Sequence, residues 1–289
     1  MTALLNEPYL RDYRHRMFRL DPSARLKSMD QAMEYIIARG MIGFWPIKDI
    51  PIPNLWTAVA GDRPVADEHD DPGHITWGWK DDLLGKKRCF YARILCKRTF
   101  FISLDLLPYL YALSRNFGDF HEDHLILYEE GKLSFPARTL YDAILQRGAL
   151  DTIELKKIGR FSGKTGDLEF NRALNELQMD FKLMPVGVSD SGAWHYSFIY
   201  DIVGRQFPDV VALAGSIQPR ESRRVLLINY LQSVGAAHLA EIARLFRWDK
   251  ASIRDCIAVL SDEGTILSSV SSESYPSSDW IALPELVLQ

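Results

Sequence analysis

The sequence predicts an α+β protein that is mainly helical and contains tandem winged-helix units, each a helix-turn-helix followed by a β-hairpin. Two observations lead to this prediction. Helical patterns at 134–178 and again at 220–263 are each followed by two short strand patterns. The length of 289 residues fits two or three folding units. We therefore expect an N-terminal winged-helix-like region with a tryptophan-rich insert at 1–133, and winged helices at 134–203 and 204–289.

The first region has one clear helix and a proline-rich stretch. Apolar residues at helical spacing predict a helix that begins near Ser28 or Asp30 and stops at Gly40. Residues 88–103 have a strand pattern with interleaved basic side chains, and residues 104–113 resemble a short buried helix. After Gly40, the segment that contains Pro46, Pro51 and Pro53 cannot form a central strand or the interior of a helix.

The second and third regions share one order of elements. In the second, Pro136 opens a helix that Gly148 ends, Asp151 caps a short helix, and a third helix covers 167–178. Strands are expected at 181–188 and 194–199, joined by the turn Ser-Asp-Ser-Gly. The third region repeats this order with helices at 220–233, 238–246 and 249–263, a stop at Gly264, and strands at 265–271 and 279–286.

Composition and cysteine use exclude several classes of protein. The chain is 47% hydrophobic and 25% charged with a formal net charge of −4, as in an ordinary globular protein. It has no apolar run long enough to span a membrane, and its N-terminus is not a secretory signal. The three cysteines lack CxxC spacing, and the seven histidines form no metal-ligand motif. We therefore expect a cytoplasmic protein with no metal and no cofactor.

Winged helices place their third helix in the major groove of double-stranded DNA, which makes DNA the expected partner. Basic residues are expected to contact DNA from both third helices and from the segment 86–98, which has six basic and no acidic residues. The set is Lys86, Lys87, Arg88, Lys164, Arg172, Arg244, Lys250 and Arg254. Winged helices also serve as dimerisation modules and spacers, so a protein partner is the alternative.

The tryptophans of the first region suggest a pocket. Trp45, Trp56, Trp77 and Trp79 all fall in this region, and such rings can stack on the two faces of a flipped base. The candidate pocket residues are Trp45, Trp77, Trp79 and Lys80. The alternative is that the rings fill a small core. His121 and His124 are interpreted as loop residues, and Gly159–Thr165 lacks the spacing and the preceding strand of a phosphate-binding loop.

Three segments resemble the tandem winged-helix DNA glycosylases of the AlkZ/YcaQ type, which act on alkylated purines and interstrand crosslinks. The fullest resemblance is in VLLINYLQSVGAAHLAEIARLFRWDKASIRDCIAVLSDEGTI at 225–266. MDQAMEYIIARGMIGF at 29–44 is similar to the family's first helix and the segment after it, and CFYARILCKRTFFISLDLLPYL at 89–110 to its strand and proline-bearing helix.

The resemblance implies DNA binding and hydrolysis of an N-glycosidic bond. The family's Gln-x-Asp or Gln-x-Gln signature corresponds here to Gly43 and Trp45, so no catalytic residue carries over and the chain is expected to be a divergent, AlkZ-related branch. A carboxylate can stabilise the cation formed in such a reaction, which makes Asp49 and Asp81 the candidate catalytic residues. The alternatives are a non-catalytic regulator that binds a small ligand, and an interaction scaffold.

Overall fold

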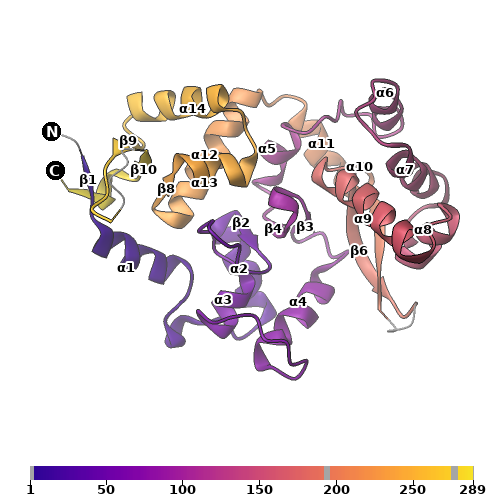
Figure 1. The fold of residues 1–289 in the computed structure, drawn as a ribbon, viewed down its shortest axis with the longest axis horizontal. Coiled ribbons are helices and arrows are strands. Elements are labelled where there is room, and N and C mark those ends of the chain that lie inside the picture. Colours follow the sequence, from indigo (N-terminus) through magenta and orange to yellow (C-terminus); the bar gives the residue numbers. More distant parts are fainter. Residues whose placement is uncertain (1–2, 192–195, 275–278, 289) are drawn as a thin grey trace. The chain divides into compact units, whose positions relative to one another are not determined.

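The computed structural model describes residues 3–191, 196–274 and 279–288, and its short strands alternate with helices in an α+β fold (Figure 1). The chain forms two compact units. Unit 1 combines Met1–Thr76 with Pro219–Gln289, and unit 2 is the continuous segment Trp77–Gln218. Within the described ranges, no helix is both long and apolar enough to cross a membrane. The division into three domains stays a prediction.

Unit 1 contains helices from both ends of the chain and strands of two to four residues. Its helices are α1 (Glu7–Met17), α2 (Met29–Arg39), α3 (Leu55–Ala60), α12 (Pro219–Val234), α13 (Leu239–Phe246) and α14 (Lys250–Asp262). Its strands are β1 (Leu4–Leu5), β2 (Met41–Gly43), β8 (Ala236–His238), β9 (Leu267–Val270), β10 (Trp280–Ala282) and β11 (Val287–Leu288).

The predicted first helix is confirmed as α2. The Ser28 hydroxyl accepts a hydrogen bond from the Gln31 amide at 3.3 Å, which satisfies one free amide of the first turn. Gly40 ends the helix with a φ of 72°, and a Cβ there would lie 2.4 Å from Nδ2 of Asn229. Both the backbone angle and the close approach require glycine.

Unit 1 is held together by contacts between residues more than 200 positions apart. The Arg14 guanidinium on α1 donates to the carbonyl oxygens of Val234 and Ala236 at 3.0 and 2.8 Å. The Tyr13 hydroxyl donates to the carbonyl of Gln232 at 2.6 Å, and β1 pairs with β11 antiparallel. The N-terminal helix therefore caps the C-terminal end of α12.

Unit 2 contains longer strands and a larger helical group. Its helices are α4 (Ile75–Leu83, which begins in unit 1), α5 (Leu107–Tyr111), α6 (Asp123–Glu129), α7 (Phe135–Arg147), α8 (Thr152–Ile158), α9 (Gly163–Met179), α10 (Val203–Gln206) and α11 (Pro208–Ala214). Its strands are β3 (Phe90–Arg93), β4 (Thr99–Ile102), β5 (Leu150–Asp151), β6 (Leu183–Ser189) and β7 (Ser197–Ile202).

Two segments share one element order and one strand order. In unit 2 the chain order is α7, β5, α8, α9, β6 and β7, and the three strands form a sheet of order β5–β7–β6 (Figure 1). In unit 1 the chain order is α12, β8, α13, α14, β9 and β10, and the three strands form a sheet of order β8–β10–β9. The predicted helices and hairpin strands are present in both. The short strands β5 and β8 were not predicted, because two or three residues carry no periodic signal.

Two sequence-based interpretations need correction. The segment 88–103 is two antiparallel strands, β3 and β4, joined by a turn in which Cys96 and Lys97 have positive φ. His124 lies in helix α6 with a side chain only 1% exposed, although its segment was interpreted as a loop. Residues 192–195, which include the end of the predicted turn and the start of the predicted strand 194–199, lie outside the described residues.

Candidate functional site

Helix α4 presents three of the predicted site residues together. Trp77, Lys80 and Asp81 are three and four positions apart, so their side chains project from one face of the helix. They contact Tyr196 and Phe198. Phe198 lies in β7 and Tyr196 directly precedes this strand, and because the two are two residues apart their side chains point to the same side. We call these five residues the Lys80 cluster.

Lys80 and Asp81 form the polar centre of this cluster. Nζ of Lys80 donates to Oδ1 of Asp81 and to the hydroxyl of Tyr196, both at 2.5 Å. The Tyr196 hydroxyl in turn donates to Oδ1 of Asp81 at 2.9 Å. One carboxylate oxygen thus accepts two hydrogen bonds, which fixes the orientation of Asp81.

Aromatic rings surround the ammonium group. Nζ of Lys80 lies 4.5 Å from the ring centre of Phe198, 5.1 Å from that of Trp77 and 5.2 Å from that of Tyr196. The Lys80 side chain is 1% exposed, and this burial lowers the pKa of its ammonium group. The negative faces of the rings and the Asp81 carboxylate oppose that effect by stabilising the charged form. Burial also raises the pKa of the Tyr196 hydroxyl, which therefore stays protonated.

The cluster supplies an oriented carboxylate at the protein surface. The Asp81 side chain is 24% exposed, so it can meet a solvent molecule or ligand while Lys80 cannot. Lys80 acts as a fixed counter-charge beneath it. A carboxylate held in this way can orient water or stabilise a cation that forms next to it.

The predicted tryptophan pocket is divided between the two units. Trp77 and Lys80 are in contact within unit 2, and Trp79 on the same helix is buried, with 7% exposure. Trp45 belongs to unit 1, where its ring lies 5.4 Å from that of Trp56 and 6.3 Å from that of His74. A single pocket formed from all four predicted residues stays a prediction.

Asp49 differs from Asp81 in its surroundings. It lies in the proline-rich segment of unit 1 with a φ of 59°, and its side chain is 64% exposed. Its Oδ2 lies 3.7 Å from Nη1 of Arg244, one of the predicted DNA-binding residues. Asp49 is thus a solvated carboxylate with a cationic neighbour.

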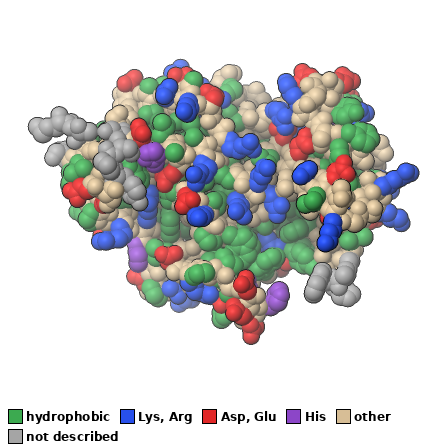
Figure 2. All heavy atoms as spheres, in the orientation of Figure 1, with side chains coloured by type: hydrophobic (Ala, Val, Ile, Leu, Met, Phe, Trp, Pro, Cys, Tyr) green, Lys and Arg blue, Asp and Glu red, His purple; other side chains and the backbone are tan. Residues whose placement is uncertain are grey.

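The predicted DNA-binding residues are exposed. Lys86, Lys87 and Arg88 follow α4, whereas Lys164 lies in the first turn of α9 and Arg172 two turns later. On unit 1, Lys250 begins α14 and Arg254 follows one turn later. On the face that Figure 2 draws, both Lys or Arg and Asp or Glu side chains are exposed, so this face is not uniformly basic.

A cavity of about 470 Å³ in unit 1 was not predicted. The segment after Trp45 supplies most of its apolar wall, whereas α1 contributes Leu10 and four polar or charged side chains, which are Glu7, Arg11, Arg14 and His15. The volume is in the range of small-molecule sites. No sequence signal could identify this cavity, because its walls come from residues 5–20 and 46–62 together with Ser272 and Trp280.

Sequence reasoning also missed a pair in unit 2 that joins the buried His124 to the partly exposed Asp142. Nε2 of His124 contacts Oδ1 of Asp142 at 2.7 Å, and burial lowers the pKa of the imidazole despite this carboxylate. The two residues are 18 positions apart on different helices, which explains why no motif revealed them.

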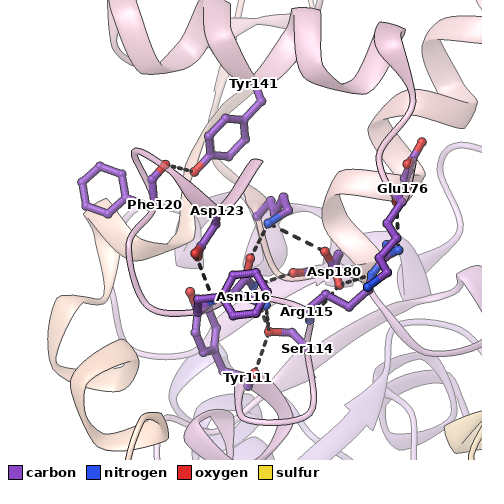
Figure 3. A network of polar contacts seen from close by, with 12 residues as sticks. Tyr111, Ser114, Arg115, Asn116, Phe120, Asp123, Tyr141, Glu176 and Asp180 are labelled. Carbon is purple, nitrogen blue, oxygen red and sulfur yellow. Dashed lines mark hydrogen bonds and ion pairs between the residues drawn. The ribbon is translucent and has the colours of Figure 1, made fainter. Parts of the chain in front are cut away.

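A second buried network lies nearby in unit 2 (Figure 3). Nζ of Lys182 donates to Oδ1 of Asn116 at 2.5 Å and lies 3.8 Å from Oδ2 of Asp180. Oδ1 of Asp180 accepts from the amide and from Nε of Arg115 at 3.1 and 3.2 Å. The Asp123 carboxylate accepts the amides of Phe117 and Gly118, and the burial of its side chain raises its pKa. These contacts hold the connection between α5 and α6 and are structural.

The family model described as AlkZ related matches residues 26–247. Among solved structures, the Streptomyces sahachiroi DNA glycosylase AlkZ is similar, with a TM-score of 0.57 and 15% sequence identity, over 99% of this chain and 71% of that one. No curated protein matches significantly. The structural likeness extends over the entire fold, and the family match covers more than half of the sequence. The chain therefore belongs to the AlkZ-related family.

Proposed function

We propose that this protein binds double-stranded DNA and takes part in the repair of alkylated purines. The observation that carries this proposal is the family match over residues 26–247. The repeated order of helices and strands in the two units supports the interpretation of both segments as winged helices. In that interpretation α9 and α14 are the third helices, which face the DNA.

The exposed basic residues are proposed to contact phosphates. Lys164 and Arg172 lie on α9, and Lys250 and Arg254 lie on α14. Lys86 and Lys87 add charge after α4. Arg244 joins them, because its 3.7 Å pairing with Asp49 is exposed and therefore weak enough to exchange for a phosphate. Such contacts position DNA without reading its sequence.

We assign Asp81 as the carboxylate for hydrolysis and place it ahead of Asp49. Its orientation is fixed by the Tyr196 hydroxyl and the Lys80 ammonium, whereas Asp49 is largely solvated. When the N-glycosidic bond breaks, the bonding electrons leave with the alkylated base and a positive charge develops at C1′ of the sugar. The carboxylate stabilises that charge and accepts a proton from the water that adds to C1′.

The test combines a gel shift with a base-release assay on one duplex, with and without N7-alkylated guanine. Retardation of both duplexes and release of the base from the alkylated one is the expected result. Asp81→Asn should abolish release and keep retardation, while Asp82→Asn, at the exposed neighbouring position, should change neither. Retardation without release by the native protein would refute the assignment of hydrolysis. No retardation at low salt would refute DNA binding and favour a scaffold that binds proteins.

The cavity of unit 1 favours a second candidate, a regulator that binds a small ligand. Its volume of about 470 Å³ suits a ligand with an apolar body and a group that pairs with Arg11 or His15. A strong preference for one operator sequence over random duplex, changed by a small molecule, would support this candidate against the repair function.

A further inference from the structure

The cavity of unit 1 has an apolar interior that is formed before a ligand binds. Leu10, Ile50 and Ile52 line it and are buried. The Ile50 amide donates to the Ile47 carbonyl at 3.3 Å, which closes a tight turn, and a proline flanks each end of this turn. Proline fixes the backbone φ, so this wall keeps its shape without a ligand. Binding in the volume of about 470 Å³ therefore requires little ordering of the wall.

Basic side chains gather where α1 borders the cavity. Arg11, Arg14 and His15 line it and are three and four positions apart, which makes them neighbours on one face of the helix. Arg11 and His15 are exposed and lie at the rim, whereas Arg14 is partly buried. The two guanidinium groups repel each other at this spacing, so an anion that lies between them is favoured.

Arg14 carries one of these charges toward the interior. Its guanidinium donates from Nε and Nη2 to the carbonyl oxygens of Val234 and Ala236, and both acceptors are neutral. Burial lowers the pKa of Arg14, and the Glu241 carboxylate opposes this effect through space. Oε2 of Glu241 itself accepts the His238 amide at 2.8 Å. An anionic group in the cavity would add a further opposite charge and stabilise the guanidinium.

The acidic side chains of the cavity wall are already engaged. Oε1 of Glu7 accepts from the Ser272 hydroxyl at 2.5 Å and from the Ser274 amide at 2.8 Å, and Oε2 accepts from the Ser274 hydroxyl at 2.6 Å. These bonds lower the pKa of Glu7 to about 2, so it stays ionised. Asp62, the other carboxylate of the wall, is exposed and solvated. The guanidinium groups of α1 thus remain able to bind the anion of a ligand.

We propose that this cavity binds a small monocarboxylate with an apolar body, whose carboxylate lies at the rim beside Arg11 and His15. A guanidinium presents two parallel N–H donors that match the two oxygens of a carboxylate, which favours this anion. The apolar body lies against the buried leucine and isoleucine side chains and loses its contact with water. The inference rests on the second candidate function, for which it names the ligand class, and it is independent of DNA repair.

The first arm of the test compares three probes of equal chain length by isothermal titration calorimetry of the full-length protein. The probes are octanoate, 1-octanol and octylamine. We expect octanoate to bind saturably at one site. 1-Octanol should bind at least about tenfold more weakly, because the charge-assisted hydrogen bonds to the guanidinium are lost. Octylamine should bind most weakly, because its cation meets the basic rim.

The second arm locates the carboxylate. Arg11→Gln should weaken octanoate binding about tenfold and leave 1-octanol binding within about twofold, since only the charged contact is removed. Arg11 is exposed, so this variant keeps the core intact. Arg16→Gln removes an exposed arginine of the same helix that does not line the cavity, and this control should bind like the native protein. Ile47→Trp, which fills the cavity from its partly exposed wall, should weaken both probes.

Three results would overturn the inference. These are the absence of saturable octanoate binding, equal affinity for octanoate and 1-octanol, and equal losses in Arg11→Gln and Arg16→Gln. Gel shifts of a duplex with and without saturating octanoate separate this inference from the proposed function. Octanoate binding that leaves retardation unchanged would uphold the ligand class and refute the regulator. Retardation of the duplex by a protein that does not bind octanoate would overturn the ligand class and leave DNA binding intact.

Discussion

At the residue scale, Lys80 illustrates how this fold keeps a charge in its interior. An ammonium group that is 1% exposed would be expelled from an apolar site, because burial penalises the charged form. Here the Asp81 carboxylate, the Tyr196 hydroxyl and three ring faces replace the lost water. The result is a carboxylate whose position depends on its buried partner.

Replacing Asp81 should therefore destabilise the protein through Lys80. Asp81→Asn leaves the buried ammonium without its counter-charge, so we expect the free energy of unfolding to fall by about 1–3 kcal/mol. This loss is smaller than that for breaking a fully buried ion pair, because Asp81 is partly exposed. Urea unfolding followed by circular dichroism measures this. Asp82→Asn should stay within about 0.5 kcal/mol of the native protein. Equal losses in both variants would show that the pair does not stabilise the fold.

His124 predicts a pH dependence. Burial holds the pKa of this imidazole below its ordinary value, so the unfolded chain binds the proton first as pH falls. The free energy of unfolding should therefore decrease as the pH falls through about 6.5, the ordinary pKa of an imidazole, over the interval from roughly pH 7 to 5.5. His124→Gln should make the loss over this range shallower, measured as unfolding free energy at several pH values. His121→Gln, at an exposed position three residues earlier, is the control, and the same shallowing there would contradict this cause.

At the element scale, helix boundaries follow local chemistry closely. Ser28, Asp151 and Asp249 each accept amide hydrogen bonds at the start of α2, α8 and α14. Gly148 ends α7 with a φ of 87°, and Gly264 follows α14 with a φ of 68°. These elements are defined by single residues at their ends, so their stability responds to those residues.

Two glycines in helical segments should respond oppositely to alanine. Gly40→Ala forces a positive φ on a residue with a Cβ and drives that atom against Asn229, so we expect a loss of about 1–3 kcal/mol. Gly78 lies within α4, and a Cβ there meets nothing within 4 Å. Gly78→Ala should stabilise by about 0.5–1 kcal/mol through helix propensity. Thermal and urea unfolding measure both changes, and a stabilised Gly40→Ala would contradict the packing argument.

At the scale of the whole molecule, the chain closes unit 1 from its two ends. Arg14 on α1 and the carbonyls after α12 are about 220 residues apart, yet they share two hydrogen bonds. Unit 2 is formed by the continuous segment between these parts. Each unit carries basic residues proposed to bind DNA, so both should contribute to a common salt dependence.

The salt dependence of duplex binding tests this proposal. Each phosphate contact contributes about 0.9 to the slope of log affinity against log salt concentration. Lys86→Gln with Lys87→Gln should therefore reduce the slope by about 2 and weaken binding at low salt. Fluorescence anisotropy between about 50 and 200 mM salt measures the slope. Lys132→Gln, which removes a lysine paired with Glu130, should leave it unchanged. A flat response in the native protein would contradict phosphate binding.

Sequence reasoning succeeded where the signal is local. The ends of α2, α8 and α14 and the order of helices and strands could be predicted, because caps, glycine stops and apolar periodicity act over a few residues. It failed for β5 and β8, which are too short for a pattern, and for His124, whose burial depends on Asp142 in another helix.

The sequence by itself determined the main helices and hairpin strands of the two repeated segments, their order and the family to which the chain belongs. It also identified Lys80 and Asp81 as residues of interest, but their partner Tyr196 lies more than 110 residues away and only folding brings it to α4. The same holds for the cavity of unit 1. Pockets and buried ion pairs are made by side chains from distant segments, so their geometry is decided by tertiary packing, which periodicity along the chain cannot encode.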